Sequence, residues 1–283
     1  MNESYFAGVG GLNIHTRSWG AAENPVGAVV IVHGFNSHSG QYASFAEQLI
    51  PGKLAVYAVD LRGRGESEGE RFYVEKFADY VDDLTKFIGL IRSQSPGLPL
   101  FLLGHSAGGV VACLYALQHQ DDIQGLICES FAFEVPAPDF VLAVLKGLSY
   151  IAPHFKSVKL KNEDFSRDPI IVEAMNNDPL IADEAQPVET MAALVRADEQ
   201  LKKEFPNITL PLLILHGTAD KAAKPSGSQL FYDTAGSLDK TLKLYEEHYH
   251  DLLNDIDKEI VVADIKHWID ERISVHRGSS AGA

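Results

Sequence analysis

The sequence predicts an α/β fold, a mostly parallel central sheet with helices on both faces and an inserted helical cap. Three observations predict it. Short apolar runs alternate with amphipathic segments through residues 1–130 and again from residue 208. The intervening residues 131–207 carry helical patterns and are far longer than an ordinary connection. A serine between glycines lies where an apolar run gives way to a helical one, at the sheet edge where α/β proteins bind ligands.

The elements of the core follow from the hydrophobic pattern in chain order. Residues 5–19 alternate polar and apolar side chains around a glycine-rich turn, which predicts a β-hairpin. The continuous apolar run Ala28–His33 is typical of a central parallel strand. The same criteria predict strands at 54–60, 98–103, 123–129, 212–216 and 241–245, and helices at 42–49, 77–91, 107–118 and 258–273.

The inserted segment and the C-terminal tail complete the expected organisation. Residues 1–130 and 208–276 form the core, and residues 131–207 form the cap. Residues 277–283 are mostly small and predict a disordered tail. Within the cap, helical spacing predicts helices at 137–151, 169–176 and 184–201.

The composition excludes several kinds of protein. A formal net charge of -15 argues against nucleic acid as a partner and against docking on anionic lipid. Cys113 and Cys128 are expected to be buried free thiols. The first residues lack the basic and apolar regions of a secretory signal. We therefore expect a cytoplasmic protein, peripheral at membranes if its cap contacts lipid.

Ser106 is the predicted nucleophile. It lies in Gly104-His-Ser-Ala-Gly108, between an expected strand and an expected helix. A strained strand-to-helix turn of this kind lifts a serine hydroxyl to the top of a sheet, and its glycines let neighbouring backbone pass close by. The alternative is a glycine-rich turn with a solvated serine, which the adjoining strand and helix disfavour.

A nucleophilic serine needs a general base, and the base needs an acidic side chain that orients it. Asp220 follows the strand at 212–216, although a purely turn-forming role is its alternative. His248 and His250 both follow the strand at 241–245. We favour His250 as the base, because it directly precedes an apolar-periodic segment at a loop–helix junction. The chain order serine, aspartate, histidine is that of α/β-hydrolase triads.

Ester cleavage puts negative charge on the carbonyl oxygen, and two backbone N–H groups usually bind it. Ala107, directly after the nucleophile, is expected to supply one. Phe35 is expected to supply the other, because its loop follows the first central strand and Gly34 permits a tight turn. The glycine-rich loops at 8–11 and 63–69 do not match phosphate-binding motifs, and no residues have metal-ligand spacing, so we expect neither cofactor nor metal.

With these residues in place, the chain resembles the monoacylglycerol lipase and lysophospholipase branch of the α/β-hydrolase superfamily. The resemblance implies the α/β-hydrolase fold, the triad and oxyanion residues named above, and a cap over an acyl-chain tunnel. It also favours His250 over His248. The matching motifs follow in order along nearly the whole chain: His33-Gly-Phe-Asn-Ser-His-Ser-Gly-Gln-Tyr42, Asp60-Leu-Arg-Gly-Arg-Gly-Glu-Ser67, Gly104-His-Ser-Ala-Gly-Gly109, Asn177-Asp-Pro-Leu180, His216-Gly-Thr-Ala-Asp220 and Tyr249-His-Asp-Leu-Leu-Asn254.

Four positions depart from the family pattern. The family has a glutamate and an arginine that help to hold a glycerol head group, where this chain has Ser37 and Gln41. Ala107 replaces a methionine, and Arg64 replaces a histidine. We expect Ser37, Gln41 and His105 to contact the substrate. Because the two head-group replacements are neutral, we also expect a broader range of leaving groups.

Residues 140–151 are apolar on nearly all sides and too short to span a bilayer. This segment either packs on the core or lines an acyl tunnel, with Leu142 and Leu145 at the substrate and its outer face against a micelle or membrane. The predicted function is a serine ester hydrolase for monoacylglycerols or similar single-chain esters. The alternatives are a carboxylesterase for small or aromatic monoesters, a lysophospholipase, and a non-catalytic small-molecule receptor on the same fold.

Overall fold

The computed structural model describes residues 1–20, 24–134 and 137–280. Eight strands form one sheet in the order β1-β2-β4-β3-β5-β6-β9-β10. The hairpin β1–β2 is antiparallel, β2 is antiparallel to β4, and the other neighbours are parallel, which confirms the predicted sheet. The strands are β1 Asn2–Ala7, β2 Asn13–Trp19, β3 Gly27–Val32, β4 Leu54–Val59, β5 Leu100–His105, β6 Gly125–Glu129, β9 Leu212–Gly217 and β10 Lys240–Tyr245.

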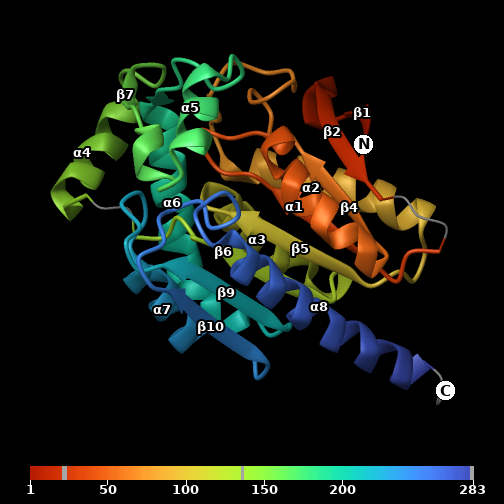
Figure 1. Cartoon of the computed structure of the whole chain (residues 1–283). Helices are drawn as coiled ribbons and strands as arrows, with labels where there is room; N and C mark the ends of the chain where they lie inside the picture. Colours follow the sequence, from red (N-terminus) through yellow and green to blue (C-terminus); the bar gives the residue numbers. More distant parts are fainter. Residues whose placement is uncertain (21–23, 135–136, 281–283) are drawn as a thin grey trace.

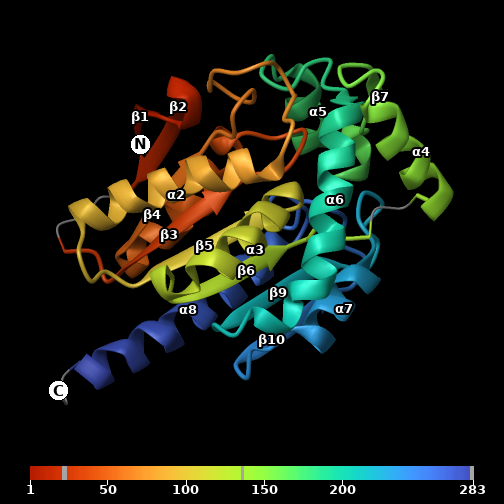
Figure 2. The same ribbon diagram turned by 180° about the vertical axis from the view of Figure 1, so that it is seen from behind.

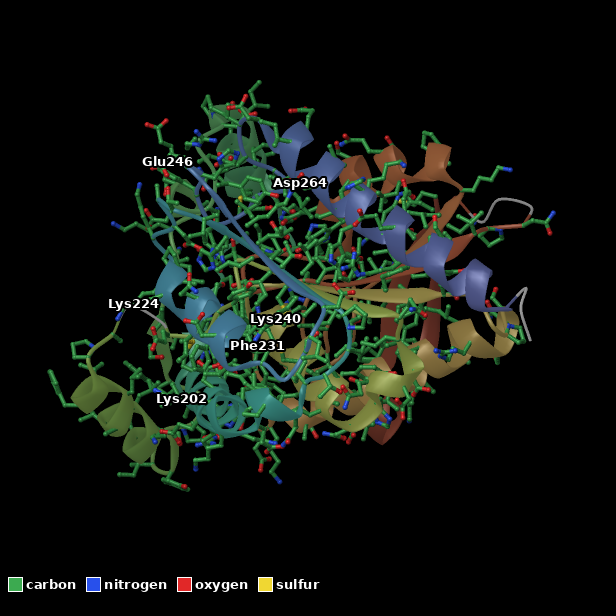
Figure 3. All side chains as sticks on the ribbon, turned by 90° about the horizontal axis from the view of Figure 1, so that it is seen from below. Lys202, Lys224, Phe231, Lys240, Glu246 and Asp264 are labelled. Carbon is green, nitrogen blue, oxygen red and sulfur yellow. The ribbon has the colours of Figure 1, made fainter. Side chains whose placement is uncertain are left out.

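Helices cover both faces of this sheet (Figure 1). Figure 2 shows one face from behind, with α2 Phe77–Gln94, α3 Ala107–His119 and α6 Val188–Glu204 in front of the strands. The helices α1 Ala43–Leu49 and α8 Lys258–Ser280 cover the other face. Seen from below, α8 and the helix α7 Pro225–Thr234, which carries Phe231, lie on opposite sides of the sheet (Figure 3).

The alternation of side chains along each strand produces these two layers. In β3, Val30 packs into the hydrophobic cluster under α2 and α3, whereas Ile31 packs into the cluster under α1 and α8. Leu102 and Leu103 of β5 divide in the same way. Both side chains of such a pair are buried, and this is why the parallel strands read as continuous apolar runs.

The parallel register brings the ends of several strands to one edge. His105 is paired with Glu129, and Glu129 with Leu215, so β5, β6 and β9 end side by side. β10 runs parallel to β9 and ends at the same edge. Ser106, Asp220 and His250 all follow strands that end here, which places three distant segments of the chain close together.

Residues 137–204 build the layer above this edge. The helix α4 Asp139–Ser149, the short strand pair β7 Lys156–Val158 and β8 Gln186–Pro187, and the helix α5 Pro169–Asn177 lie together at one end of the molecule (Figure 1). α6 then returns along the sheet and contributes Leu194 and Leu201 to the main hydrophobic cluster.

Three features differ from the sequence-based expectations. Helix α7 was not expected, because Gly227 and Ser228 weaken its helical pattern; Phe231, fully buried, fixes it against the core. The pair β7–β8 is too short to give a periodic signal. Residues 277–280, expected to belong to a disordered tail, continue α8 to Ser280; residues 281–283 lie outside the described residues.

Candidate active site

Ser106 lies on a sharp turn between β5 and α3. Its backbone has φ 54° and ψ -122°, a strained conformation for a residue other than glycine. Two glycines make room for the turn: a Cβ on Gly34 would lie 2.7 Å from the Ser106 Cβ, and one on Gly108 would lie 2.1 Å from the Val32 carbonyl oxygen. The end of β3 and the loop after it can therefore approach Ser106 only because Gly34 and Gly108 lack a side chain.

The serine, a histidine and an aspartate form a continuous chain of contacts. His250 Nε2 lies 2.8 Å from Ser106 Oγ, and His250 Nδ1 lies 2.7 Å from Asp220 Oδ2. The second histidine considered, His248, instead directs its Nδ1 toward the Glu246 carbonyl oxygen, at 3.0 Å. The structure thus brings His250, not His248, between the serine and the aspartate.

Asp220 is held as a carboxylate. Its Oδ1 accepts hydrogen bonds from the backbone N–H groups of Ala222 and Ala223, at 2.7 and 2.9 Å. Burial raises the pKa of Asp220, but the neighbouring His250 and His216 lower it more, so the pKa lies well below the usual range. The sequence reasoning missed His216, whose Nε2 lies 3.0 Å from Asp220 Oδ2; its position four residues before Asp220 was the available signal.

The loop that carries Phe35 lies beside Ser106. Gly34 lies against Ser106, and Ala107 begins α3 directly after the serine. Arg64 packs over the Phe35 ring, with its guanidinium carbon 4.2 Å from the ring centroid. The two expected oxyanion donors, the backbone N–H groups of Phe35 and Ala107, therefore both lie on segments that adjoin Ser106.

An apolar cavity of about 300 Å³ opens under the cap. Leu142 and Leu145 line it, as expected. Ser106, His250 and Asp220 do not line this cavity, but Phe165, which does, packs edge-on against the His250 ring with the centroids 5.0 Å apart, so the cavity reaches the site through Phe165. Its further lining residues are Ala137, Val141, Val158, Lys159, Leu160, Lys161, Asp164, Met191, Lys221 and Ala222.

Three residues that are expected to contact the substrate do not line this cavity. Ser37 is buried and does not line this cavity. The Gln41 amide donates to Asp178 Oδ2 at 3.5 Å, so it contacts the cap. His105 lies behind the His250 ring, with its Nδ1 3.0 Å from the Tyr42 hydroxyl.

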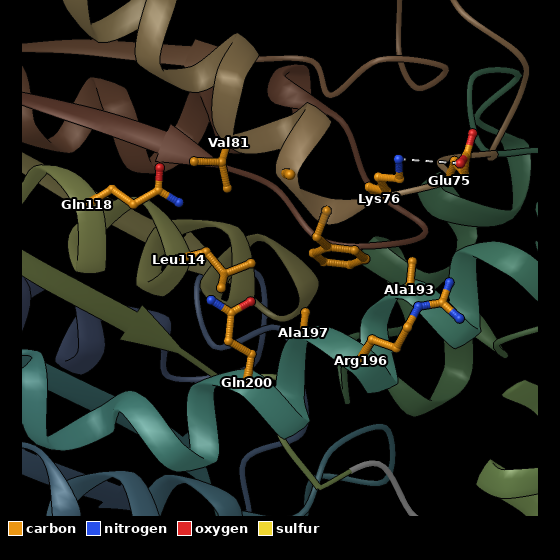
Figure 4. Close-up of a pocket in the computed structure, with 11 residues that line it drawn as sticks. Glu75, Lys76, Val81, Leu114, Gln118, Ala193, Arg196, Ala197 and Gln200 are labelled. Carbon is orange, nitrogen blue, oxygen red and sulfur yellow. Dashed lines mark ion pairs between the residues drawn. The ribbon is translucent and has the colours of Figure 1, made fainter.

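A second hollow lies between α2, α3 and α6 (Figure 4). Its volume is about 240 Å³, and Val81, Leu114 and Ala197 are among its lining residues. Neither Ser106 nor His250 lines it. This hollow is therefore separate from the serine site.

In the part of the chain that the structure describes, one set of side chains has donor atoms close enough to suggest a metal. It consists of His105, Glu129 and Asp251, with one donor atom of each within 4.8 Å of the others. All three are buried, and burial raises the pKa of both carboxyl groups. A metal needs deprotonated ligands and an entry path, so this set does not fit a metal site.

The fold and the site define an α/β hydrolase with an inserted cap and a serine on a strand-to-helix elbow. The family model described as serine aminopeptidase, S33, matches residues 23–257, and the chain belongs to this family. The monoacylglycerol lipase of Mycolicibacterium smegmatis is 33% identical over 95% of this chain and 96% of its own. Human monoglyceride lipase is 33% identical over 93% of this chain and 88% of its own. The crystal structure of Paleococcus ferrophilus monoacylglycerol lipase matches with a TM-score of 0.82 and 30% identity, covering 93% of this chain and 99% of its own.

Proposed function

We propose that this protein is a serine ester hydrolase that cleaves monoacylglycerols or similar single-chain esters through an acyl-enzyme. The observation that carries the proposal is the contact chain from Ser106 through His250 to Asp220. The names of the relatives give the substrate class, since two of them are monoacylglycerol or monoglyceride lipases.

We assign a step to each side chain on the basis of this contact chain. Ser106 Oγ attacks the acyl carbon while His250 Nε2 takes its proton. Asp220 holds the imidazole in orientation and stabilises its protonated form, and the proton then passes to the leaving alcohol. Water repeats these steps in reverse to release the carboxylic acid. The N–H groups of Phe35 and Ala107 bind the oxyanion.

The apolar cavity fits an acyl chain. Leu142 and Leu145 face it from α4, and Phe165 connects it to His250. Each methylene group moved from water to such a surface contributes about 0.8 kcal/mol, so binding should strengthen with chain length until the cavity is full.

The charges around the cavity disfavour an aminopeptidase activity, which the family description also suggests. Binding of a free α-ammonium group requires acidic side chains near the serine. Three lysines, Lys159, Lys161 and Lys221, line the cavity, against one acidic residue, Asp164. A neutral ester fits this lining better than a cationic amino terminus.

The outer face of the cap supports contact with a micelle or membrane surface. Phe140, Tyr150 and Ile151 are 72%, 84% and 83% exposed, and Phe155 is also exposed. Several large apolar side chains exposed within residues 140–155 are typical of an interaction surface. None of the helices that the structure describes is both long and apolar enough to cross a membrane, so such contact would be peripheral.

A matched substrate panel tests the proposed function. We expect hydrolysis of 1-acylglycerols, with ethyl esters of the same acyl length cleaved more slowly by about tenfold or less. Lysophosphatidylcholine, aromatic monoesters and aminoacyl arylamides represent the competing activities. Preference for an arylamide, or no turnover of any ester, would contradict the proposal.

A further inference from the structure

Three buried polar side chains lie directly behind the proposed triad. His105 precedes Ser106, Glu129 ends the neighbouring strand β6, and Asp251 follows His250. One donor atom of each lies within 4.8 Å of those of the other two. The His105 and His250 rings are 5.0 Å apart, so the group is in contact with the base.

Each of these side chains has a polar atom without a hydrogen-bond partner in the described part of the chain. These atoms are His105 Nε2, Glu129 Oε2 and Asp251 Oδ1. The other carboxyl oxygens are bound: Leu253 N donates to Glu129 Oε1 at 3.2 Å, and Asn254 Nδ2 donates to Asp251 Oδ2 at 3.0 Å. Unpartnered buried polar atoms are few in native proteins, so three in one place distinguish this cluster from the rest of the core.

In a buried site, a second negative charge on two carboxyl groups this close together is strongly disfavoured. Burial and the neighbouring Asp251 raise the pKa of Glu129 well above its usual range, and burial raises the pKa of Asp251 to about 6. His105 does not compensate a second negative charge, because burial holds its pKa well below the usual range. At neutral pH the pair therefore holds one proton and one negative charge.

We propose that Glu129 and Asp251 share one proton and that their single negative charge stabilises the protonated form of His250 during acyl transfer. Both are positioning residues, because they act through His250 and do not touch the substrate. The effect on rate rests on the proposed function, whereas the shared proton does not.

Apart from His250, the other titratable groups near Glu129 and Asp251 have fixed protonation states, so only the charge of this pair can change. The titratable groups that face it are Tyr42 beside α1, His105 from β5, Tyr245 from β10, and Asp220, His250 and Asp255 from the loops at the sheet edge. Asp220 is held as a carboxylate, and Asp255 is paired with Arg167 at 2.9 Å. Burial raises the pKa of both tyrosines, so they stay neutral.

A shared charge has a signature that independent charges lack. In Glu129→Gln, Asp251 keeps the charge. In Asp251→Asn, Glu129 loses the negative charge that adds to the effect of burial on its pKa, so under the proposal Glu129 ionises and takes the charge over. Only the double variant removes it. The two substitutions should therefore be strongly non-additive.

The first experiment measures kcat/KM against pH for both single variants and the double variant. Activity falls on the acid side because protonated His250 cannot accept the serine proton. Loss of a negative charge disfavours that protonated form, so the acid limb of the double variant should move to lower pH by about one unit. Each single variant should move it by less than about 0.3 unit, by the same reasoning. Asp198→Asn is the matched control, because it removes a partly buried carboxyl group of α6 whose acidic neighbours are Glu134 and Glu199.

The second experiment needs no turnover, and it separates this proposal from the proposed function. Carbon-13 NMR of labelled carboxyl groups should show Glu129 protonated at pH 7 in the unmodified protein and ionised in Asp251→Asn. Two carboxylates ionised at pH 7 in the unmodified protein would overturn the proposal, as would additive shifts of the acid limb.

Discussion

Arg64 and Glu184 form an ion pair that joins the core to the cap. The two side chains are each 1% exposed. Arg64 Nη2 also donates to Gln186 Oε1 at 2.7 Å, and Glu184 Oε1 accepts the backbone N–H of Asn36 at 2.9 Å. Because Asn36 follows Phe35, this pair connects the cap segment just before β8 to the loop proposed to bind the oxyanion. Arg64 is one of the positions where the sequence departs from its family.

Breaking this pair should destabilise the protein strongly. In Glu184→Gln, Arg64 keeps a buried charge without its carboxylate, which should lower the free energy of unfolding by about 3–5 kcal/mol. Urea unfolding measures the change. The exposed pair Glu75–Lys76, seen in Figure 4, provides the control, and Glu75→Gln should change stability by about 1 kcal/mol or less. Equal small effects would show that the buried pair does not hold the cap.

Substitution of Ser106, the proposed nucleophile, should abolish both labelling and turnover. A fluorophosphonate probe should modify Ser106, whose hydroxyl contacts His250. Ser106→Ala should remove the label and lower kcat by about 10⁴ or more, because triad residues act as a unit. Ser226 is the control, because it is exposed on α7 and its hydroxyl donates a hydrogen bond to Glu134. The variant Ser226→Ala should still be labelled. Stoichiometric labelling of Ser106→Ala would contradict the assignment.

Substitution of His250 and substitution of His248 should have very different effects on activity. His250→Ala should lose almost all activity, since it removes the group between Ser106 and Asp220. His248→Ala should keep most activity, because its ring contacts a carbonyl oxygen and Tyr245. Steady-state kinetics on a soluble ester measures both. The reverse order would make His248 the base.

A charge in the apolar cavity should penalise long acyl chains selectively. Leu145→Asp should reduce hydrolysis of laurate esters far more than that of acetates, because each buried methylene contributes about 0.8 kcal/mol, or about fourfold in kcat/KM. Val144→Asp is the control on the same helix, since Val144 is 65% exposed and does not line the cavity. Equal losses on both esters for Leu145→Asp would indicate damaged folding instead.

The buried His33 should make stability fall toward acid pH. Burial lowers its pKa to about 4 from a usual 6.5. Its Nε2 accepts the Leu61 N–H at 3.0 Å, and its Nδ1 lies 2.7 Å from the Gly34 carbonyl oxygen. Between these pH values the unfolded chain binds a proton that the folded chain excludes, so the free energy of unfolding should fall by about 3 kcal/mol as the pH falls.

Urea unfolding at pH 7 and pH 4 measures this loss. His33→Gln should show a pH dependence smaller by about the same amount, because glutamine does not titrate. His267→Gln, at an exposed position of α8, should leave the pH dependence unchanged. If the free energy of unfolding of His33→Gln depended on pH as strongly as that of the unmodified protein, His33 would not be the cause of the acid destabilisation.

The parallel strands and the turn that carries Ser106 could be predicted because their signals are local. Strands buried on both faces need uninterrupted apolar runs, and β3 and β9 show them. The elbow at Ser106 needs small residues within a few positions along the chain. Helix α7 could not be predicted, because packing of Phe231 overrides the weak helical preference of Gly227 and Ser228.

The side-chain partners required the folded chain. Sequence order indicated an aspartate and a pair of histidines near the sheet edge, but the loop after β10 orients His250, and not His248, toward Ser106. Glu129 and Asp251 lie far apart in the sequence and meet because β6 ends beside the loop that follows β10. The hydrophobic pattern of a chain specifies which residues are buried, whereas strand register and loop conformation determine which buried polar groups face one another.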